Sequence, residues 1–384
     1  MSRPLRVDAD PAFRTRSANP YNARLYTEIQ RLGVQVRDLR FGQLLTSTPD
    51  VVHLHWPELS FLSGHRHWRV ISRLLIFFSL LRVARLRGTR LIWTAHNVGA
   101  HEQRSTAALR AWFRRWWCAN VDGVLSLTED GVEAVRATYP ELSAVPAFVT
   151  PHGHYRDEYD FSIDRGAARA ALGIADTCTL VVTLGQIRPY QNVPLLVDAV
   201  QACGRADVLL LVAGKPDSPA TADRVRVAAG SSPAVRLELE FLPPDRIATI
   251  LRAANLVVLP YRAIQNSGSA ILALSADRPV VVPELGAMTE LQEQIGADWV
   301  HTYSGEFSPA ALAESLHWLA SSRPAQPDLT DLDWPAIAAR TVAAYEEVLA
   351  RPRIGRRARR VTKRNSTAPH PPQPAAREMN RAST

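Results

Sequence analysis

Two loops in the second half of the chain combine small, polar and cationic residues in a way that suits a diphosphate. They span residues 183–192 and 261–269, and in each an apolar strand-like run stops and a helix-like run follows. Backbone N–H groups at a helix N-terminus, a guanidinium and unhindered glycines hold phosphate oxygens well. The residues that we expect to bind the phosphates are Gly185, Arg188, Gln191, Lys215, Asn266, Ser267, Gly268 and Ser269.

Histidines stand where strand-like runs end in the first half of the chain. His96 is one of them, and a neutral imidazole at such a place can take a proton from an attacking hydroxyl. We therefore predict His96 as the catalytic base, with Glu102 as a second catalytic residue behind it. The alternative is that His96 only hydrogen-bonds loop backbone.

Other polar residues at these strand ends are predicted to line a cleft. They are His55, Glu58, Asn97, His152 and His154. The glycine between the last two histidines would let a ligand approach the backbone closely. Strand alternation also places His53 on the same face as His55, although no loop follows His53 directly.

Strand-like and helix-like runs alternate along nearly the whole chain, which is typical of α/β domains with parallel sheets. We predict two doubly wound, Rossmann-like domains, residues 1–165 and 166–330, that face a central cleft. Residues 331–350 would form a C-terminal helix that crosses back, and residues 351–384 a disordered basic tail.

The positive charge of the chain is unevenly distributed. The net charge is +8, yet residues 351–384 alone hold ten Arg and Lys against one Glu, so the rest is close to neutral. The tail is either simply solvated or a tether to anionic lipid. No nucleic-acid partner is expected, because no aromatic residues lie among these basic ones.

A second basic region lies in the first domain. No acidic residue occurs between Glu58 and Glu102, while seven arginines fall between Arg66 and Arg90. The apolar run 74–81 is too short to span a bilayer, and residues 110–117 mix tryptophan with arginine. This composition favours contact with an anionic membrane surface; the alternative is a buried helix beside a partly covered aromatic one.

Several classes of function are disfavoured by the residue spacing. The three cysteines form no metal or redox motif, no H-x-x-x-H pair occurs, and no G-x-S-x-G elbow follows a strand. We therefore expect no metal and no cofactor. The N-terminus lacks the apolar region of a secretory signal, so a cytoplasmic protein is expected, attached peripherally to the inner face of the plasma membrane.

Residues 181–190, 212–215 and 254–260 resemble the donor domain of GT-B glycosyltransferases of the family 4 type. The strand ends at 52–57, 94–97 and 151–154 are similar to those of bacterial polysaccharide transferases, mannosyltransferases on lipid-linked glycans among them. The resemblance covers about residues 19–349. It implies a GT-B fold, a nucleoside diphosphate sugar as donor, with GDP-mannose as the first expectation, and a glycan or lipid-linked acceptor.

Two departures from that family bear on the mechanism. Gln191 and Asn192 stand where a lysine usually follows the arginine, and residues 264–272 lack the usual pair of glutamates. If the enzyme inverts, His96 is the expected base; if it retains, His96 would position substrate. The alternatives left open are a sugar-nucleotide epimerase or hydrolase of the same architecture, and a non-catalytic subunit that binds nucleotide sugars.

Overall fold

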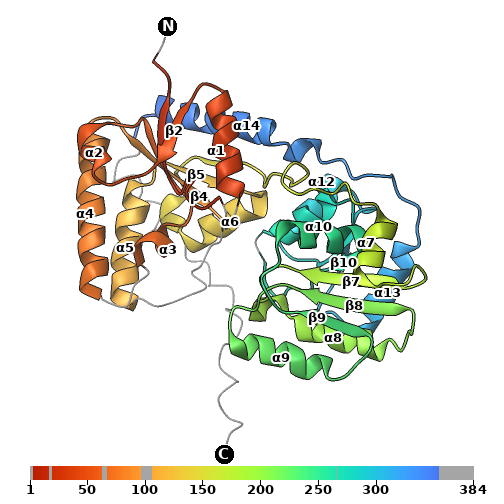
Figure 1. Ribbon diagram of the computed structural model, residues 1–384. Coiled ribbons are helices and arrows are strands. Elements are labelled where there is room, and N and C mark those ends of the chain that lie inside the picture. The colour runs from red at the N-terminus through yellow and green to blue at the C-terminus, as the bar shows by residue number, and fades with distance from the viewer. Residues whose placement is uncertain (1–2, 17–19, 63–66, 97–105, 265, 354–384) are drawn as a thin grey trace, which may run out of the picture.

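The polypeptide folds around two parallel β-sheets with helices on both faces of each (Figure 1). The computed structural model describes residues 3–16, 20–62, 67–96, 106–264 and 266–353. The strands of the first sheet are β1 (Arg6–Asp10), β2 (Gln35–Asp38), β3 (Val51–Leu54), β4 (Arg90–Ala95), β5 (Gly123–Ser126) and β6 (Ala147–Val149). Their spatial order is β2-β1-β3-β4-β5-β6.

The second sheet repeats this design with the remaining six strands. They are β7 (Thr179–Leu184), β8 (Val208–Ala213), β9 (Val235–Glu238), β10 (Leu256–Val258), β11 (Val280–Pro283) and β12 (Val300–Tyr303), in the order β12-β11-β10-β7-β8-β9. The order reverses between β10 and β7, and ligands bind outside the carboxyl ends of the strands at such a switch point.

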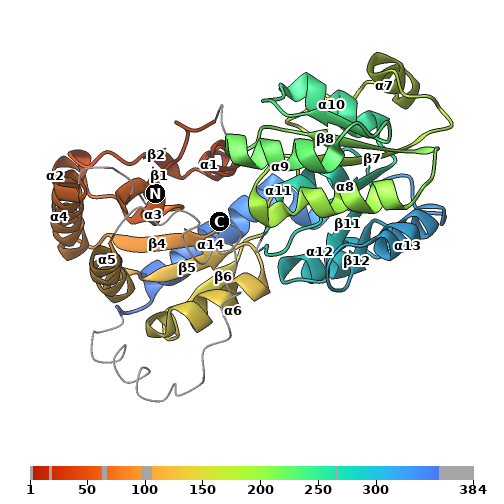
Figure 2. The same cartoon turned by 90° about the horizontal axis from the view of Figure 1, so that it is seen from below.

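Helices cover both sheets. Those of the first domain are α1 (Tyr21–Arg31), α2 (Gln43–Thr46), α3 (Pro57–Leu62), α4 (His67–Leu86), α5 (Ala107–Asn120) and α6 (Glu129–Thr138). Those of the second are α7 (Arg165–Leu172), α8 (Val193–Ala202), α9 (Pro219–Ala229), α10 (Pro244–Ala253), α11 (Gly268–Ser275), α12 (Ala287–Ile295) and α13 (Pro309–Leu319). The last helix, α14 (Trp334–Ala350), returns to the first domain and packs beside α1 (Figures 1 and 2).

The strand sequences explain why these sheets are buried on both faces. All six residues of β8 are buried apolar residues, as expected for a central parallel strand. In β3, Val52 and Leu54 belong to the core under α4 and α5, whereas Val51 belongs to the core under α1 and α14. Side chains alternate between the two faces of a strand, so one strand contributes to two cores.

The predicted α/β architecture is confirmed: two doubly wound units and a helix that crosses back from the second to the first. β6 ends at Val149 and α7 begins at Arg165, so the connection between the two units lies in these residues. Most of the predicted basic tail, from residue 354 onward, lies outside the described residues.

Candidate active site

The two predicted phosphate loops lie side by side at the carboxyl edge of the second sheet. Gly214 follows β8 with φ at +142°, and a Cβ atom there would overlap the carbonyl oxygen of Gly185. Gly185 has φ at +122°, and a Cβ atom there would lie 2.8 Å from Oγ of Ser269 in the first turn of α11. Both positions need glycine because the loops after β7 and β8 and the start of α11 touch one another.

The N-terminus of α11 is capped within the same loop. Ser267 Oγ accepts a hydrogen bond from the backbone N–H of Ala270 at 3.1 Å and lies 3.1 Å from the buried hydroxyl of Tyr261. This cap fixes the direction of the helix and leaves its first turn, at Gly268 and Ser269, facing a cavity of about 430 Å³. The positive end of a helix dipole beside a cavity favours an anionic group there.

Arg188 also lines this cavity and is half-buried. Its guanidinium donates to the side-chain oxygen of Gln186 at 2.7 Å, which orients it along the cavity wall. The Gln191 side chain accepts the backbone N–H of Arg188 at 3.0 Å, so Gln191 holds the turn in shape. Lys215 is exposed and does not line the cavity, although its carbonyl accepts the backbone N–H of Ile187 at 3.0 Å.

In the first domain, three histidines form a hydrogen-bonded chain with a tyrosine of α1. The Tyr26 hydroxyl lies 2.7 Å from His53 Nδ1 and 2.6 Å from His55 Nε2. His55 Nδ1 lies 2.9 Å from His96 Nε2. The chain thus runs from the buried interior to the end of β4, where His96 stands.

The inner end of this chain is anchored by two hydroxyl groups. Tyr345 of α14 lies with its hydroxyl 2.7 Å from His53 Nδ1, and Thr94 Oγ1 lies 2.7 Å from His53 Nε2. His53 is fully buried, so its ring is shielded from solvent. A helix from the far end of the sequence therefore takes part in the network of the first domain.

His96 is held by aromatic rings as well. Trp56 stacks on it with ring centroids 4.4 Å apart, and Tyr21 meets it edge-on at 5.2 Å. Of the described residues, none hydrogen-bonds its other ring nitrogen, Nδ1. Burial lowers the pKa of His96 to about 3 and that of His53 to about 3, and it lowers the pKa of His55 as well. All three imidazoles are therefore neutral at pH 7.

The two domains meet beside His96. The Asn266 side chain donates to the carbonyl oxygen of His96 at 2.9 Å, joining the α11 loop to the end of β4. His152, whose Nε2 lies 3.2 Å from the Tyr155 hydroxyl, faces Gly268 from the first domain. Phosphate-loop residues and first-domain histidines are therefore brought together in one cleft.

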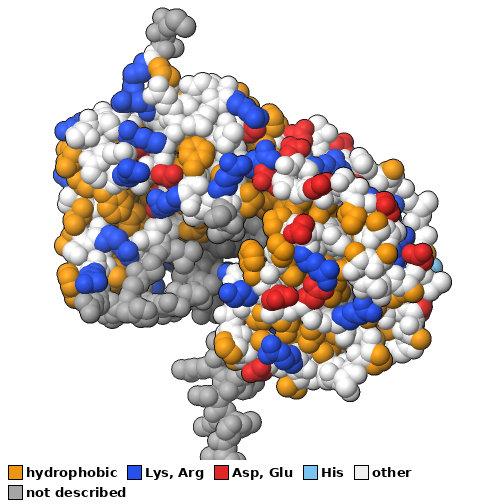
Figure 3. All heavy atoms as spheres, in the orientation of Figure 1, with side chains coloured by type: hydrophobic (Ala, Val, Ile, Leu, Met, Phe, Trp, Pro, Cys, Tyr) orange, Lys and Arg blue, Asp and Glu red, His pale blue; other side chains and the backbone are white. Residues whose placement is uncertain are grey.

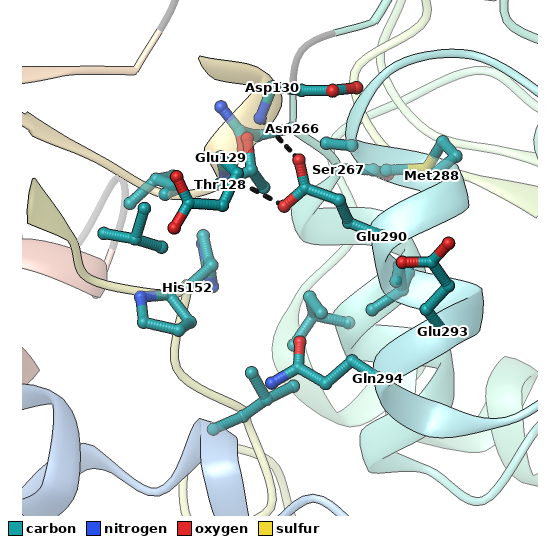
Figure 4. Close-up of a pocket in the computed structure, with 17 residues that line it drawn as sticks. Thr128, Glu129, Asp130, His152, Asn266, Ser267, Met288, Glu290, Glu293 and Gln294 are labelled. Atoms are coloured by element: carbon teal, nitrogen blue, oxygen red, sulfur yellow. Dashed lines mark hydrogen bonds between the residues drawn. The ribbon is translucent and has the colours of Figure 1, made fainter. Parts of the chain in front are cut away.

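A second cavity of about 590 Å³ lies next to this junction, again between the domains (Figure 4). His152, Asn266 and Ser267 line it together with acidic residues of α6 and α12. Figure 4 shows the Glu290 carboxylate reaching from α12 to the start of α6, where it accepts the backbone N–H groups of Glu129 at 2.9 Å and Asp130 at 2.5 Å. A carboxylate at a helix N-terminus is stabilised by the dipole, so this contact helps to hold the domains together.

Comparisons with known proteins agree with this geometry. Residues 178–322 match the family model described as glycosyl transferases group 1. Over 343 residues, 87% of this chain and 90% of the other, the sequence is 31% identical to a GDP-mannose:glycolipid 4-beta-D-mannosyltransferase of Xanthomonas campestris. The chain belongs to the group 1 glycosyltransferases.

Solved structures agree with this assignment at the level of the fold. A glycosyltransferase from Rickettsia africae has a TM-score of 0.65 at 9% identity and covers 92% of this chain and 100% of its own. HepE of Anabaena, solved with UDP and glucose, has a TM-score of 0.57 at 17% identity, with 90% and 98% covered. The fold of this glycosyltransferase is thus GT-B, as the sequence resemblance implied.

The remaining sequence-predicted residues fall in different places in the glycosyltransferase. Glu58 accepts a hydrogen bond from the Tyr139 hydroxyl at 3.3 Å, and burial raises its pKa. His154 turns away from the cavities, with Nε2 2.7 Å from the Asp333 carboxylate just before α14. Asn97 and Glu102 lie outside the described residues.

One interpretation from the sequence is wrong. Gly153 was expected to admit a ligand between His152 and His154. A Cβ atom at this position would overlap the indole of Trp334, whose Nε1 donates to the His154 carbonyl at 2.8 Å. The missing side chain therefore makes room for α14.

Several residues around His96 and at the domain junction carry no clear signal in the sequence. Tyr26, Thr94 and Tyr345 in the histidine chain and Glu290 at the domain junction were not singled out. The shared face of His53 and His55 was the only local signal for the chain, because its tyrosines come from α1 and α14. Of the described residues, no three His, Cys, Asp or Glu side chains are grouped so as to hold a metal ion.

Burial of neutral histidines predicts that the enzyme loses stability in mild acid. The folded pKa of His53 and of His96 is about 3, below the ordinary value of about 6.5 in an unfolded chain. The unfolded state therefore binds protons first as the pH falls from about 6.5 towards 3, and the folded state is destabilised. Between pH 7.5 and 5.0 we expect the unfolding free energy in urea to fall by on the order of 2 kcal/mol for each histidine.

A His96→Asn variant should show a smaller fall over this pH range, whereas His317→Asn, at an exposed position of α13, should show the full one. Equal pH dependence in all three proteins would contradict the burial of His96 as a neutral group.

Proposed function

We propose that this glycosyltransferase moves mannose from GDP-mannose to a glycolipid acceptor, a lipid-linked saccharide. The observation that carries the proposal is the 31% identity to a GDP-mannose:glycolipid 4-beta-D-mannosyltransferase, which extends over both domains. The geometry supports it, since the second domain offers a cavity with a guanidinium and a helix N-terminus, and the first offers a neutral histidine at the junction.

The donor diphosphate would bind at Arg188 and the first turn of α11. These groups would stabilise the charge that develops on the leaving nucleoside diphosphate, a task often performed by a divalent cation or a lysine. The loop has Gln191 and Asn192 at the positions where the sequence analysis looked for a lysine, so the helix end and Arg188 would carry this work. We propose a reaction that needs no metal and no cofactor.

We propose a β-linkage, as in the name of the Xanthomonas relative, and this linkage sets the stereochemistry. The mannosyl group of GDP-mannose is α-linked to the diphosphate, so formation of a β-linkage inverts the anomeric carbon. An inverting transfer needs a base for the acceptor hydroxyl, and His96 is our candidate. The acceptor sugar would lie near His152 and Asn266 in the cavity between the domains. Its reactive hydroxyl would reach His96, whose carbonyl oxygen accepts the side-chain N–H of Asn266.

Transfer assays test this function directly. Purified enzyme would be incubated with a synthetic polyprenyl diphosphate saccharide and with GDP-mannose, UDP-glucose or dTDP-glucose, and the product anomer determined by NMR. We expect transfer from GDP-mannose with a β-linkage. Hydrolysis or epimerisation of the donor without an acceptor would favour the alternative enzyme classes, and binding without turnover for any acceptor would favour a non-catalytic subunit.

Arg188→Ala is expected to weaken GDP-mannose binding about 10- to 100-fold, because a charge-assisted hydrogen bond to phosphate contributes about 1.5–3 kcal/mol. Isothermal titration with GDP-mannose and with GDP measures this loss. Arg224→Ala, at an exposed position of α9, is the matched control and should bind like the wild type. Equal affinities of the two variants would remove Arg188 from the donor site.

We also propose that the enzyme works at the cytoplasmic face of a membrane, docked by the outer face of α4 and α5. On this α4–α5 face Trp68, Ile71, Leu75, Ile76 and Trp112 are exposed, with Arg69, Arg82 and Arg115 exposed beside them. Figure 3 shows hydrophobic and basic side chains together at the edge of the molecule where Figure 1 places α4. Apolar and aromatic residues bordered by arginines suit an anionic lipid headgroup region.

The docking would be interfacial. Trp68 is 65% exposed, and the Arg69 guanidinium lies 5.3 Å from its ring centroid. Of the helices in the described residues, none has the length and apolar character to cross a bilayer. A glycolipid acceptor would come from the same membrane, so docking would present its saccharide to the cleft.

Replacing Trp68 and Leu75 together by serine should lower binding to anionic vesicles about a hundredfold or more, because burial of each side chain contributes roughly 1.5 kcal/mol or more. Flotation of the full chain with vesicles of phosphatidylglycerol and phosphatidylcholine measures this. Val227→Ser with Phe241→Ser removes two apolar side chains of the second domain that are more exposed than Trp68 and Leu75, and it is the control. If both double variants float like the wild type, the α4–α5 face is not the docking surface.

A further inference from the structure

We propose that the buried chain of Tyr26 and His55, anchored by His53 and Tyr345, sets which ring nitrogen of His96 carries its proton, leaving Nδ1 free to accept the proton of the acceptor hydroxyl. The proposal rests on the proposed inverting transfer. It makes Tyr26 and His55 positioning residues for the reaction.

Between Tyr26 and His96, the hydrogen-bond partners limit the proton positions to two patterns. Each neutral imidazole carries one proton, so in every pair one nitrogen must donate and the other atom accept. In the first pattern His96 Nε2–H donates to His55 Nδ1, His55 Nε2–H donates to the Tyr26 oxygen, and the Tyr26 hydroxyl donates to His53 Nδ1. His53 then donates from Nε2 to Thr94 Oγ1.

The second pattern runs the other way between Tyr26 and His96. The Tyr26 hydroxyl donates to His55 Nε2, and His55 Nδ1–H donates to His96 Nε2. His96 must then carry its own proton on Nδ1, and that nitrogen cannot act as a base. Only the first pattern leaves an Nδ1 lone pair for the acceptor.

Tyr26 is the branch point that separates these patterns. Its oxygen has contacts with both His53 and His55, and its ring is fully buried between α1 and the sheet. In the first pattern the Tyr26 hydroxyl donates to His53 Nδ1 in place of the Tyr345 hydroxyl, which lies at the same 2.7 Å from that nitrogen, and the Tyr26 oxygen accepts the proton of His55. Without the hydroxyl group, nothing in the chain holds the His55 proton on Nε2.

The hydrogen-bonded side chains of Tyr26 and His55 take the place of the carboxylate that commonly orients a catalytic histidine. Of the described acidic residues, none hydrogen-bonds His53, His55 or His96. The charged groups on the neighbouring elements have other partners: Asp10 pairs with Arg14, and Asp38 accepts the backbone N–H groups of Ala12 and Phe13. The other titratable groups that face these histidines are Tyr21, His152 and Tyr345.

The chemical step then balances as follows. The acceptor oxygen forms a bond to the anomeric carbon while its proton moves to His96 Nδ1. The bond between that carbon and the donor phosphate oxygen breaks, and GDP leaves with the electron pair. The imidazolium formed on His96 keeps the hydrogen bond from its Nε2–H to His55 Nδ1. It returns its proton to solvent after the product leaves.

The tautomer can be measured without any assay of transfer. Nitrogen-15 NMR of the full chain labelled at histidine distinguishes Nδ1–H from Nε2–H, and the His96 signals are those lost in His96→Asn. We expect wild-type His96 to carry its proton on Nε2. Tyr26→Phe should move it measurably towards Nδ1–H, whereas Tyr303→Phe, at a buried tyrosine of the second domain, should leave it unchanged.

A wild-type His96 protonated on Nδ1 would overturn the proposal, whether or not the variants fold. An unchanged tautomer in a folded Tyr26→Phe would also overturn it. If His96 carries its proton on Nε2 as expected but no donor supports transfer, the proposed function fails. The role of Tyr26 and His55 in setting the His96 tautomer then still stands.

Kinetics supply a second readout. Tyr26→Phe should lower kcat about tenfold with the KM for GDP-mannose unchanged, and a His55→Ala background should abolish that effect because the two residues act through one contact. Independent, multiplicative losses in the double variant would contradict a shared role.

Discussion

His96→Asn is expected to lower the rate of mannose transfer about 10²- to 10⁴-fold, the range typical of a removed general base. Donor affinity should stay within about twofold of the wild type, because the diphosphate would bind at Arg188 and α11. Asparagine keeps a polar side chain that can contact His55, but it cannot take a proton. Single-turnover transfer at saturating GDP-mannose, with titration of GDP in parallel, separates the two effects.

The matched control is His317→Asn, which changes an exposed histidine of α13 and should transfer at the wild-type rate. A His96→Asn enzyme with full activity would show that another group takes the proton, or that the transfer retains configuration and needs no enzymic base. Transfer with a retained anomeric configuration would identify the second case.

The positions of the two predicted phosphate loops in the fold could be predicted because their signals are local. The sequence alone shows a strand, a glycine, a cation and a helix start within ten residues. The fold then places two such loops at one edge of the sheet. The contact between Gly214 and Gly185 is a consequence of that edge. His96 could be predicted for the same reason, since its position at the end of a strand is a property of the sequence around it.

The partners of His96 could not be predicted in this way. His53 and Tyr345 are 292 residues apart in sequence, and nothing local to α14 indicates that its tyrosine reaches β3. His154 shows the opposite failure: its strand-end position is the same as that of His152, yet packing of α14 turns it to Asp333. The direction of a side chain at a strand end depends on which other elements pack there. The local sequence does not contain this tertiary information.

Arg169→Met should destabilise the second domain by about 3–5 kcal/mol, which is a large part of the stability of a typical domain. The Arg169 side chain is 1% exposed and ties α7 to the ends of neighbouring elements. Its guanidinium donates to the carbonyl oxygens of Ala253 at 2.9 Å, Ala175 at 2.5 Å and Cys178 at 2.5 Å. It also donates to the Asn255 side chain at 3.0 Å, and that side chain accepts the backbone N–H of Leu180 at the start of β7.

Methionine fills a similar volume but leaves these acceptors without donors, and a buried unsatisfied polar group costs about 1–3 kcal/mol. Arg169→Lys should recover only part of the loss, because an ammonium cannot reproduce the planar fork. Arg165→Met changes an exposed arginine of the same helix and should unfold within about 0.5 kcal/mol of the wild type. Urea unfolding followed by tryptophan fluorescence compares the three. If Arg169→Met unfolded like Arg165→Met, the buried guanidinium would be dispensable, and apolar packing alone would hold α7 against α10.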